Sequence, residues 1–204
     1  MAINHLLRAA ILCDKPNPRF SYIAPTYRQA KAVAWDYLKQ FAGAIPMVRF
    51  HETELRCDLP NGARIQLLGA ENPDSLRGIY QDGTCLDEMA DMPESLFPEI
   101  IRPALSDRKG WALFIGTPRG HNAFYELYDA AERQDEWHTA LYKASETGIL
   151  DDEELEAASA MMSPDQYAQE YECSWVANVP GAVYGKELQE LHEKGRITSV
   201  PYDL

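Results

Sequence analysis

The feature that most restricts the fold of this 204-residue chain is an alternation of short β-rich runs with helical segments. The run "RFSYIAP" at 19–25 is rich in β-forming residues, and the next segment places apolar side chains at helical spacing. The same order recurs further along the chain, which predicts an α/β fold with a mainly parallel sheet flanked by helices. The predicted helices span residues 2–13, 27–41, 93–105 and 122–133, the last with Asn122 as its expected cap. The predicted strands span residues 19–25, 83–87 and 111–116. In helix 27–41 the apolar residues at helical spacing are Ala30, Val33, Ala34, Tyr37, Leu38 and Phe41, and its Tyr and Trp residues are assigned to the core.

Two further regions interrupt this alternation. Residues 53–68 form two alternating segments around Asn61-Gly62, a dipeptide that supplies the positive φ angles of a hairpin turn, so an inserted β-hairpin is expected. Residues 151–172 contain two helix starts, the second with Ser163 as cap, Pro164 at the first helical position and Gln166 at the position of a capping box. We therefore expect one domain over residues 1–180, followed by a linker over residues 181–204.

Polar side chains stand at the ends of two predicted strands, where open parallel sheets bind their ligands. Asp87 and Glu88 end one strand, and "GTPRG" at 116–120 ends the next. In a P-loop ATPase such an aspartate holds magnesium and the following glutamate polarises the attacking water. Taken alone, an Asp-Glu pair is more often a solvated strand end, and Thr117 is as often a turn former before Pro118.

Charge and cysteine content narrow the class of protein. Residues 1–130 carry 14 Lys/Arg and 16 Asp/Glu, whereas residues 131–204 carry 5 and 16, so the acidic surplus belongs to the last third. A broad DNA-binding face would carry a basic excess, which restricts any nucleic-acid contact to a local patch or a shared one. The four cysteines form no CxxC pair and no secretory signal is visible, which favours a reducing cytoplasm and no membrane association.

Four segments, in order, carry a resemblance to a known family. They are "YIAPTYRQAKAVAWDYLKQF", "DSLRGIYQDGTCLDEMADMP", "LFIGTPRGHNAFYELYDAA" and "DQYAQEYECSWVANVPGAVYG". Together they resemble the ATPase domain of the large terminase subunit of tailed bacteriophages, a motor that packages DNA into a procapsid. The resemblance covers most of the chain and implies a P-loop NTPase-like fold.

The resemblance also implies roles for individual residues. Asp87 would hold Mg²⁺, and Glu88 would be the catalytic carboxylate. Gly116 and Thr117 would bind ATP as part of the family's coupling motif. Arg77, in "SLRG", would act as a catalytic arginine finger on the nucleotide of a neighbouring subunit, although it can equally pair with Asp74. The implied partners are double-stranded DNA, the terminase small subunit, the portal protein and other copies of the large subunit in a ring, within the cytoplasm of the host bacterium.

The chain also departs from that family. It contains no GxxxxGK[ST] motif, so the first strand and the phosphate loop are expected to be missing, and the second, nuclease domain would lie beyond the tail. Loss of that strand would leave an open edge or an apolar groove beside the strand of Asp87. Two alternatives to an ATP-driven packaging motor remain: an inactive prophage remnant or split fragment that only binds partners, and a helicase-type ATPase.

Overall fold

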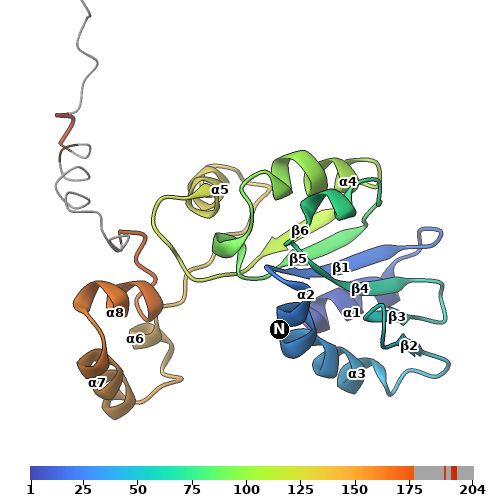
Figure 1. Cartoon of the computed structure of the whole chain (residues 1–204), viewed down its shortest axis with the longest axis horizontal. Coiled ribbons are helices and arrows are strands. Elements are labelled where there is room, and N and C mark those ends of the chain that lie inside the picture. The colour runs from blue at the N-terminus through green and yellow to red at the C-terminus, as the bar shows by residue number, and fades with distance from the viewer. Residues whose placement is uncertain (177–190, 192–193, 197–204) are drawn as a thin grey trace, which may run out of the picture. The chain divides into compact units, whose positions relative to one another are not determined.

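The computed structural model describes residues 1–176, 191 and 194–196, and the chain divides into two compact units, residues 1–116 and residues 117–204 (Figure 1). The first unit contains a six-stranded sheet in the order β2-β3-β4-β1-β5-β6. Strands β4, β1, β5 and β6 run parallel, whereas β3 is antiparallel to both β2 and β4. The predicted mainly parallel α/β fold is therefore confirmed. The strands are β1 Arg19–Ala24, β2 Arg49–His51, β3 Arg56–Asp58, β4 Arg64–Gly69, β5 Gly83–Leu86 and β6 Trp111–Phe114.

Helices cover both faces of this sheet (Figure 1). On one face, α1 (Ala2–Leu12) and the helix that runs from α2 (Tyr27–Ala30) to α3 (Asp36–Ala42) form the core with the apolar side chains of β1, β3 and β4. On the other face, a wide helical turn, Leu96–Ile101, leads into α4 (Arg102–Ser106). The ring of Phe97 in this turn packs edge to face against the ring of Phe114 in β6, with the ring centroids 4.7 Å apart. Burial on both faces explains why the parallel strand β5 is buried along its whole length.

The helix predicted over residues 27–41 forms, but part of its predicted core face is wrong. Val33, Tyr37 and Phe41 are 52%, 56% and 38% exposed, although the tryptophan of this helix, Trp35, is buried as expected. The cause is a wide π-type turn at Lys31–Trp35 between α2 and α3. An extra residue in one turn rotates the helix beyond it, so a regular 3.6-residue period no longer predicts the inner face. The buried positions are Ala30, Ala34, Trp35, Leu38 and Ala42.

The helix predicted over residues 93–105 begins later, at Leu96, and also contains a wide turn. The Arg102 N–H donates to the Phe97 carbonyl, five residues back. The next residue, Pro103, has no N–H with which to continue a regular ladder. A proline within the predicted segment therefore widened the helix.

The hairpin predicted within residues 53–68 is confirmed as the antiparallel pair of β3 and β4. Its turn is longer than a two-residue turn, because Leu59 N–H donates to the Ala63 carbonyl at 2.8 Å around a five-residue loop. Gly62 takes the positive φ of 83°, and the Asn61 side chain donates to the Ala10 carbonyl at 2.9 Å, which ties the turn to α1. Strand β2, which extends this hairpin, was missed by the sequence reasoning.

The second unit contains α5 (Ala123–Ala131), α6 (Ala144–Thr147), α7 (Asp152–Met161) and α8 (Pro164–Glu170). Asn122 caps α5 and Ser163 forms a full capping box on α8, as predicted. Trp175 packs against α5, with ring centroids 5.4 Å from Phe124, 5.4 Å from Tyr125 and 5.6 Å from Tyr128. The expected linker at 181–204 lies outside the described residues, apart from 191 and 194–196. Within the described part of the chain, no helix is long and apolar enough to cross a bilayer.

A buried carboxylate joins the amino ends of β1 and β5. The Asp82 side chain is 2% exposed and accepts hydrogen bonds from Arg108 Nε at 3.0 Å and from the Arg19 N–H at 2.9 Å, and Lys15 Nζ lies 3.2 Å away. Burial opposes ionisation of Asp82, but these donors outweigh it and hold the pKa of the carboxyl below its ordinary value. The site therefore stabilises the first unit while Asp82 is charged.

We expect Asp82→Asn to lower the free energy of unfolding by about 2 kcal/mol at neutral pH, because a buried charged acceptor of several hydrogen bonds is replaced by a neutral amide. Since folding lowers the pKa of Asp82, this contribution is complete above the unfolded-state pKa of about 3.9 and is lost as the pH falls below it. Urea unfolding at pH 7 and at acid pH would measure both effects. Asp36→Asn, which removes an exposed partner of Lys39, should change stability far less. If the difference in unfolding free energy between the parent and Asp82→Asn stayed the same at acid pH, the charge of Asp82 would not be the source of the stabilisation.

Candidate functional site

Asp87 and Glu88 come directly after the buried strand β5, where the chain turns sharply. The Asp87 N–H still bonds to the Ile23 carbonyl of β1 at 2.8 Å, but the next residue, Glu88, has left-handed backbone angles of φ 55° and ψ 48°. A short 3₁₀ turn, Met89–Asp91, follows. The two residues also differ in burial, because Asp87 is half-buried and Glu88 is exposed. A left-handed conformation at a residue other than glycine is strained, and such strain is common at functional sites.

The Asp87 carboxylate is bound by a residue that the sequence reasoning did not select. The Tyr22 O–H of β1 donates to Asp87 Oδ2. Tyr22 faces Cys85 in the β1–β5 register, so Asp87 lies one step further along the same face of the sheet. No local motif marks Tyr22, because only the register between two strands far apart in the sequence places it there.

The end of β6 lies next to the turn that carries Glu88. Ile115 N–H donates to the Leu86 carbonyl at 2.9 Å, and Met89 N–H donates to the Ile115 carbonyl at 3.0 Å. The predicted residue Gly116 follows immediately, so the structure places Gly116 beside the acidic turn within the first unit. Thr117 begins the second unit, and its proximity to Asp87 stays a prediction.

Arg77 follows a 3₁₀ turn, Pro73–Leu76, and is held by acids of its own chain. Its Nε donates to Asp74 Oδ1 at 2.8 Å, and an Nη atom lies 3.7 Å from the Glu99 carboxylate. The intrachain pair with Asp74 that the sequence allowed is thus confirmed. The Arg77 side chain is nevertheless 52% exposed, so its guanidinium remains accessible from solvent.

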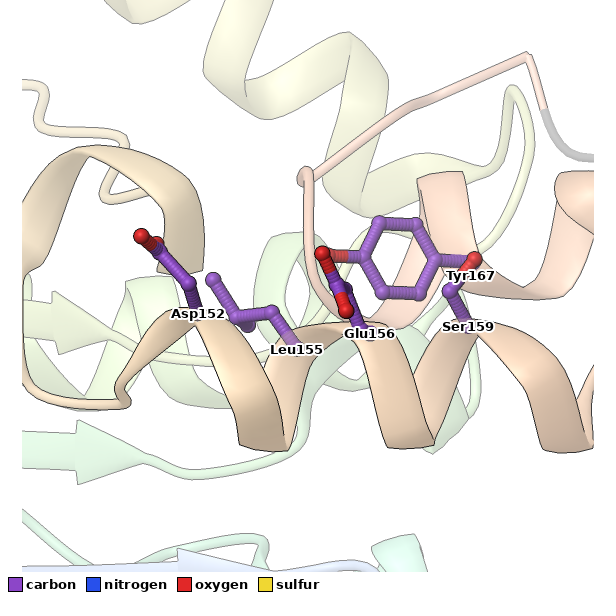
Figure 2. A pocket seen from close by; sticks show the side chains of 5 residues that line it. All are labelled: Asp152, Leu155, Glu156, Ser159 and Tyr167. Carbon is purple, nitrogen blue, oxygen red and sulfur yellow. The ribbon is translucent and has the colours of Figure 1, made fainter.

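The hollow drawn in Figure 2 belongs to the second unit and suits a nucleotide poorly. It measures about 350 Å³ and lies between α7 and α8, where Tyr167 sits beside Glu156 and Ser159. Asp152 and Glu156 give it two carboxylates, and among the described residues no Lys or Arg lines it and no strand end adjoins it. The acidic turn of the first unit, by contrast, follows the carboxyl end of the parallel strand β5, where such sheets bind their ligands.

A row of arginines crosses the sheet face that α1 and α3 do not cover. Strand register aligns Arg49, Asp58, Arg64 and Arg19 across four neighbouring strands, with Arg56 in the next row. Asp58 accepts from Arg64 Nε at 2.8 Å and from Arg56 Nε at 3.2 Å, which orients both guanidinium groups. Arg49 is exposed and the other three arginines are half-exposed. We call Arg19, Arg49, Arg56 and Arg64 the arginine face.

The comparison with protein families identifies the chain over most of its length. The family model described as terminase large subunit, T4likevirus-type, N-terminal, matches residues 6–190. The large terminase subunit of Thermus virus P23-45 is 33% identical over 136 residues, which cover 57% of this chain and 28% of that protein. The counterpart from Escherichia phage T5 is 28% identical over 169 residues, covering 79% of this chain and 38% of that protein. The chain thus spans well under half the length of these curated relatives.

Solved structures agree with this family. The ATPase domain of the large terminase of Thermus phage P74-26 superposes with a TM-score of 0.62 at 26% identity, covering 86% of this chain and 81% of that domain. A large terminase of a thermophilic bacteriophage, solved with ADP, has the same fold, with a TM-score of 0.72 at 18% identity over 86% of this chain and 44% of that one. The P-loop NTPase-like fold that the resemblance implied is therefore confirmed. The chain belongs to the large terminase subunit family of tailed bacteriophages and carries its N-terminal, ATPase-domain fold.

Proposed function

We propose that this chain is the ATPase region of a phage DNA-packaging motor, which couples ATP hydrolysis to translocation of double-stranded DNA into the procapsid. The observation that carries the proposal is the Asp87–Glu88 turn at the carboxyl end of β5, next to the end of β6. That edge of a parallel sheet is where ligands bind, and ADP and ATP-γ-S are bound by a related large terminase. The domain would extend over residues 1–180, with residues 181–204 as a linker.

The residues at this turn suit a metal that arrives with a nucleotide. Among the residues that the structure describes, no group of three His, Cys, Asp or Glu side chains could hold a metal ion by itself. One carboxylate is enough when phosphate oxygens supply further ligands, which is how Mg²⁺ is usually bound. Asp87 would then hold the hydrated Mg²⁺, Glu88 would accept the proton of the attacking water, and Gly116 and Thr117 would lie near the phosphates.

The proposed partners follow from the same function: double-stranded DNA, the terminase small subunit, the portal protein and further copies in a ring, in the cytoplasm of the host. Arg77 is the residue proposed to reach a neighbouring copy. Its ion pairs with Asp74 and Glu99 are exposed, so releasing them costs little.

We expect Arg77→Ala to lower ATP turnover of the assembled motor by a factor of about 10³. The variant lacks the permanent positive charge that stabilises the negative charge of the transition state. The rate of the unassembled subunit should not change, since the finger acts between subunits. Steady-state ATPase assays of a complete subunit that carries a phosphate loop, with and without procapsids, would measure both rates. Arg102→Ala, another exposed arginine of the first unit, serves as the control. An equal loss in both states would place Arg77 in its own subunit's site or in folding.

The arginine face is the proposed DNA contact. Residues 1–70 carry nine Lys/Arg against five Asp/Glu, in contrast to the acidic remainder of the chain. The row from Arg49 to Arg19 crosses three strand spacings, about 14 Å, which equals the axial rise of roughly four nucleotides of one DNA strand. Guanidinium groups also match the geometry of phosphate oxygens. The overall acidic charge restricts any nucleic-acid contact to a local or shared patch, and the arginine face is such a local patch.

We expect the double variant Arg49→Glu/Arg64→Glu to bind duplex DNA at least about tenfold more weakly, with the slope of log K against log salt smaller by about 2. Fluorescence anisotropy with a labelled duplex at several salt concentrations would measure this. Arg8→Glu, an exposed residue of α1, is the matched control. Unchanged DNA affinity, together with altered self-association, would assign the face to an acidic protein surface instead.

A further inference from the structure

Asp87 is held in place from the strand next to its own. Tyr22 is 2% exposed, and its ring belongs to the core that α1 and α3 cover. Its hydroxyl donates to Asp87 Oδ2, just beyond the carboxyl end of β5. A buried tyrosine normally finds one polar partner for its hydroxyl, and here that partner is the carboxylate proposed to hold Mg²⁺.

We propose that Tyr22 is a positioning residue that holds one oxygen of the Asp87 carboxylate and leaves the other for the hydration shell of Mg²⁺. The inference rests on the proposed role of Asp87. The backbone at Asp87 is already held by its N–H bond to the Ile23 carbonyl at 2.8 Å. What remains free is rotation of the carboxylate, and the Tyr22 hydroxyl restricts it. Partners that orient a metal-binding carboxylate commonly change metal affinity when they are removed.

The chemistry of the hydroxyl supports this arrangement. A phenol group is protonated at neutral pH, so its O–H acts as a donor to the Asp87 carboxylate. An O–H donor adds no charge, so it orients Asp87 without cancelling the negative charge that attracts the metal.

A purely structural role makes a different prediction. If the bond serves only to satisfy a buried hydroxyl, its removal should alter stability and leave metal binding unchanged. Tyr22→Phe separates the two roles, because it keeps the ring in the core and removes only the hydroxyl. Tyr80→Phe is the matched control, since the Tyr80 O–H donates at 3.0 Å to the Asn17 carbonyl, away from Asp87.

The test uses a complete large terminase subunit that carries this segment together with a phosphate loop, with Mn²⁺ in place of Mg²⁺ and a fixed concentration of ADP. Electron paramagnetic resonance of free Mn²⁺ would give the metal affinity of the complex, and thermal unfolding would give stability. We expect Tyr22→Phe to weaken Mn²⁺ binding about tenfold, with metal-free ADP affinity unchanged and Tyr80→Phe equal to the parent.

The outcomes separate this inference from the proposed function. If Asp87→Asn weakens Mn²⁺ binding but Tyr22→Phe does not, Tyr22 has only a structural role and the inference is overturned. If Asp87→Asn also leaves Mn²⁺ affinity unchanged, the proposed metal role of Asp87 fails first. A loss in Tyr22→Phe that Tyr80→Phe shares, with lowered unfolding temperatures in both, would also overturn it.

Discussion

Replacing Glu88 with glutamine should lower ATP turnover of the complete motor by a factor on the order of 10² or more, while nucleotide binding is retained. Glutamine keeps the size and the hydrogen-bonding oxygen of the side chain but cannot accept the proton of the attacking water. The exposed position of Glu88, just beyond the strand end, allows this exchange without disturbing the core. Single-turnover hydrolysis and equilibrium binding of ATP would give the two quantities separately.

The matched control is Glu94→Gln, which removes an exposed carboxylate six residues further along. Its turnover should equal that of the parent. Equal rates for Glu88→Gln and the parent would remove Glu88 from the catalytic role. A Glu88→Gln variant that no longer binds ATP would instead indicate that the left-handed turn depends on the carboxylate.

The 204-residue chain by itself should bind Mg-ATP weakly or not at all and should hydrolyse it no faster than background. Asp87 and Glu88 act on a metal that phosphate oxygens already hold, and the chain contains no GxxxxGK[ST] loop to bind those phosphates. Calorimetry with Mg-ATP, with and without an added peptide that carries the family's phosphate loop, measures this. Binding is expected only with the peptide.

The structure changes where such a peptide would pair. An open edge was expected beside the strand of Asp87, and this was wrong, because β5 is paired with β1 on one side and β6 on the other. The sheet ends at β6 and at β2, so an added strand has to pair at one of these two edges. A peptide with alanine in place of the loop's lysine is the control. Micromolar binding of Mg-ATP by the chain alone would contradict the interpretation that Asp87 and Glu88 form only part of the nucleotide site.

Local patterns were sufficient for much of the fold. The strands β1, β5 and β6 and the caps at Asn122 and Ser163 were all predicted, because they depend on residues close together in the sequence. Asp87 and Glu88 could be selected for the same reason, since they directly follow a strand of β-forming residues.

Only the tertiary structure determined which side chains meet across paired strands and which face of a distorted helix is buried. The Tyr22–Asp87 bond and the arginine face exist only through the register between strands that are far apart in the sequence. Val33, Tyr37 and Phe41 are exposed because a wide turn shifts the inner face of their helix. Sequence periodicity predicts which residues can share a face of one element, but packing between elements determines which face is buried and which side chains meet.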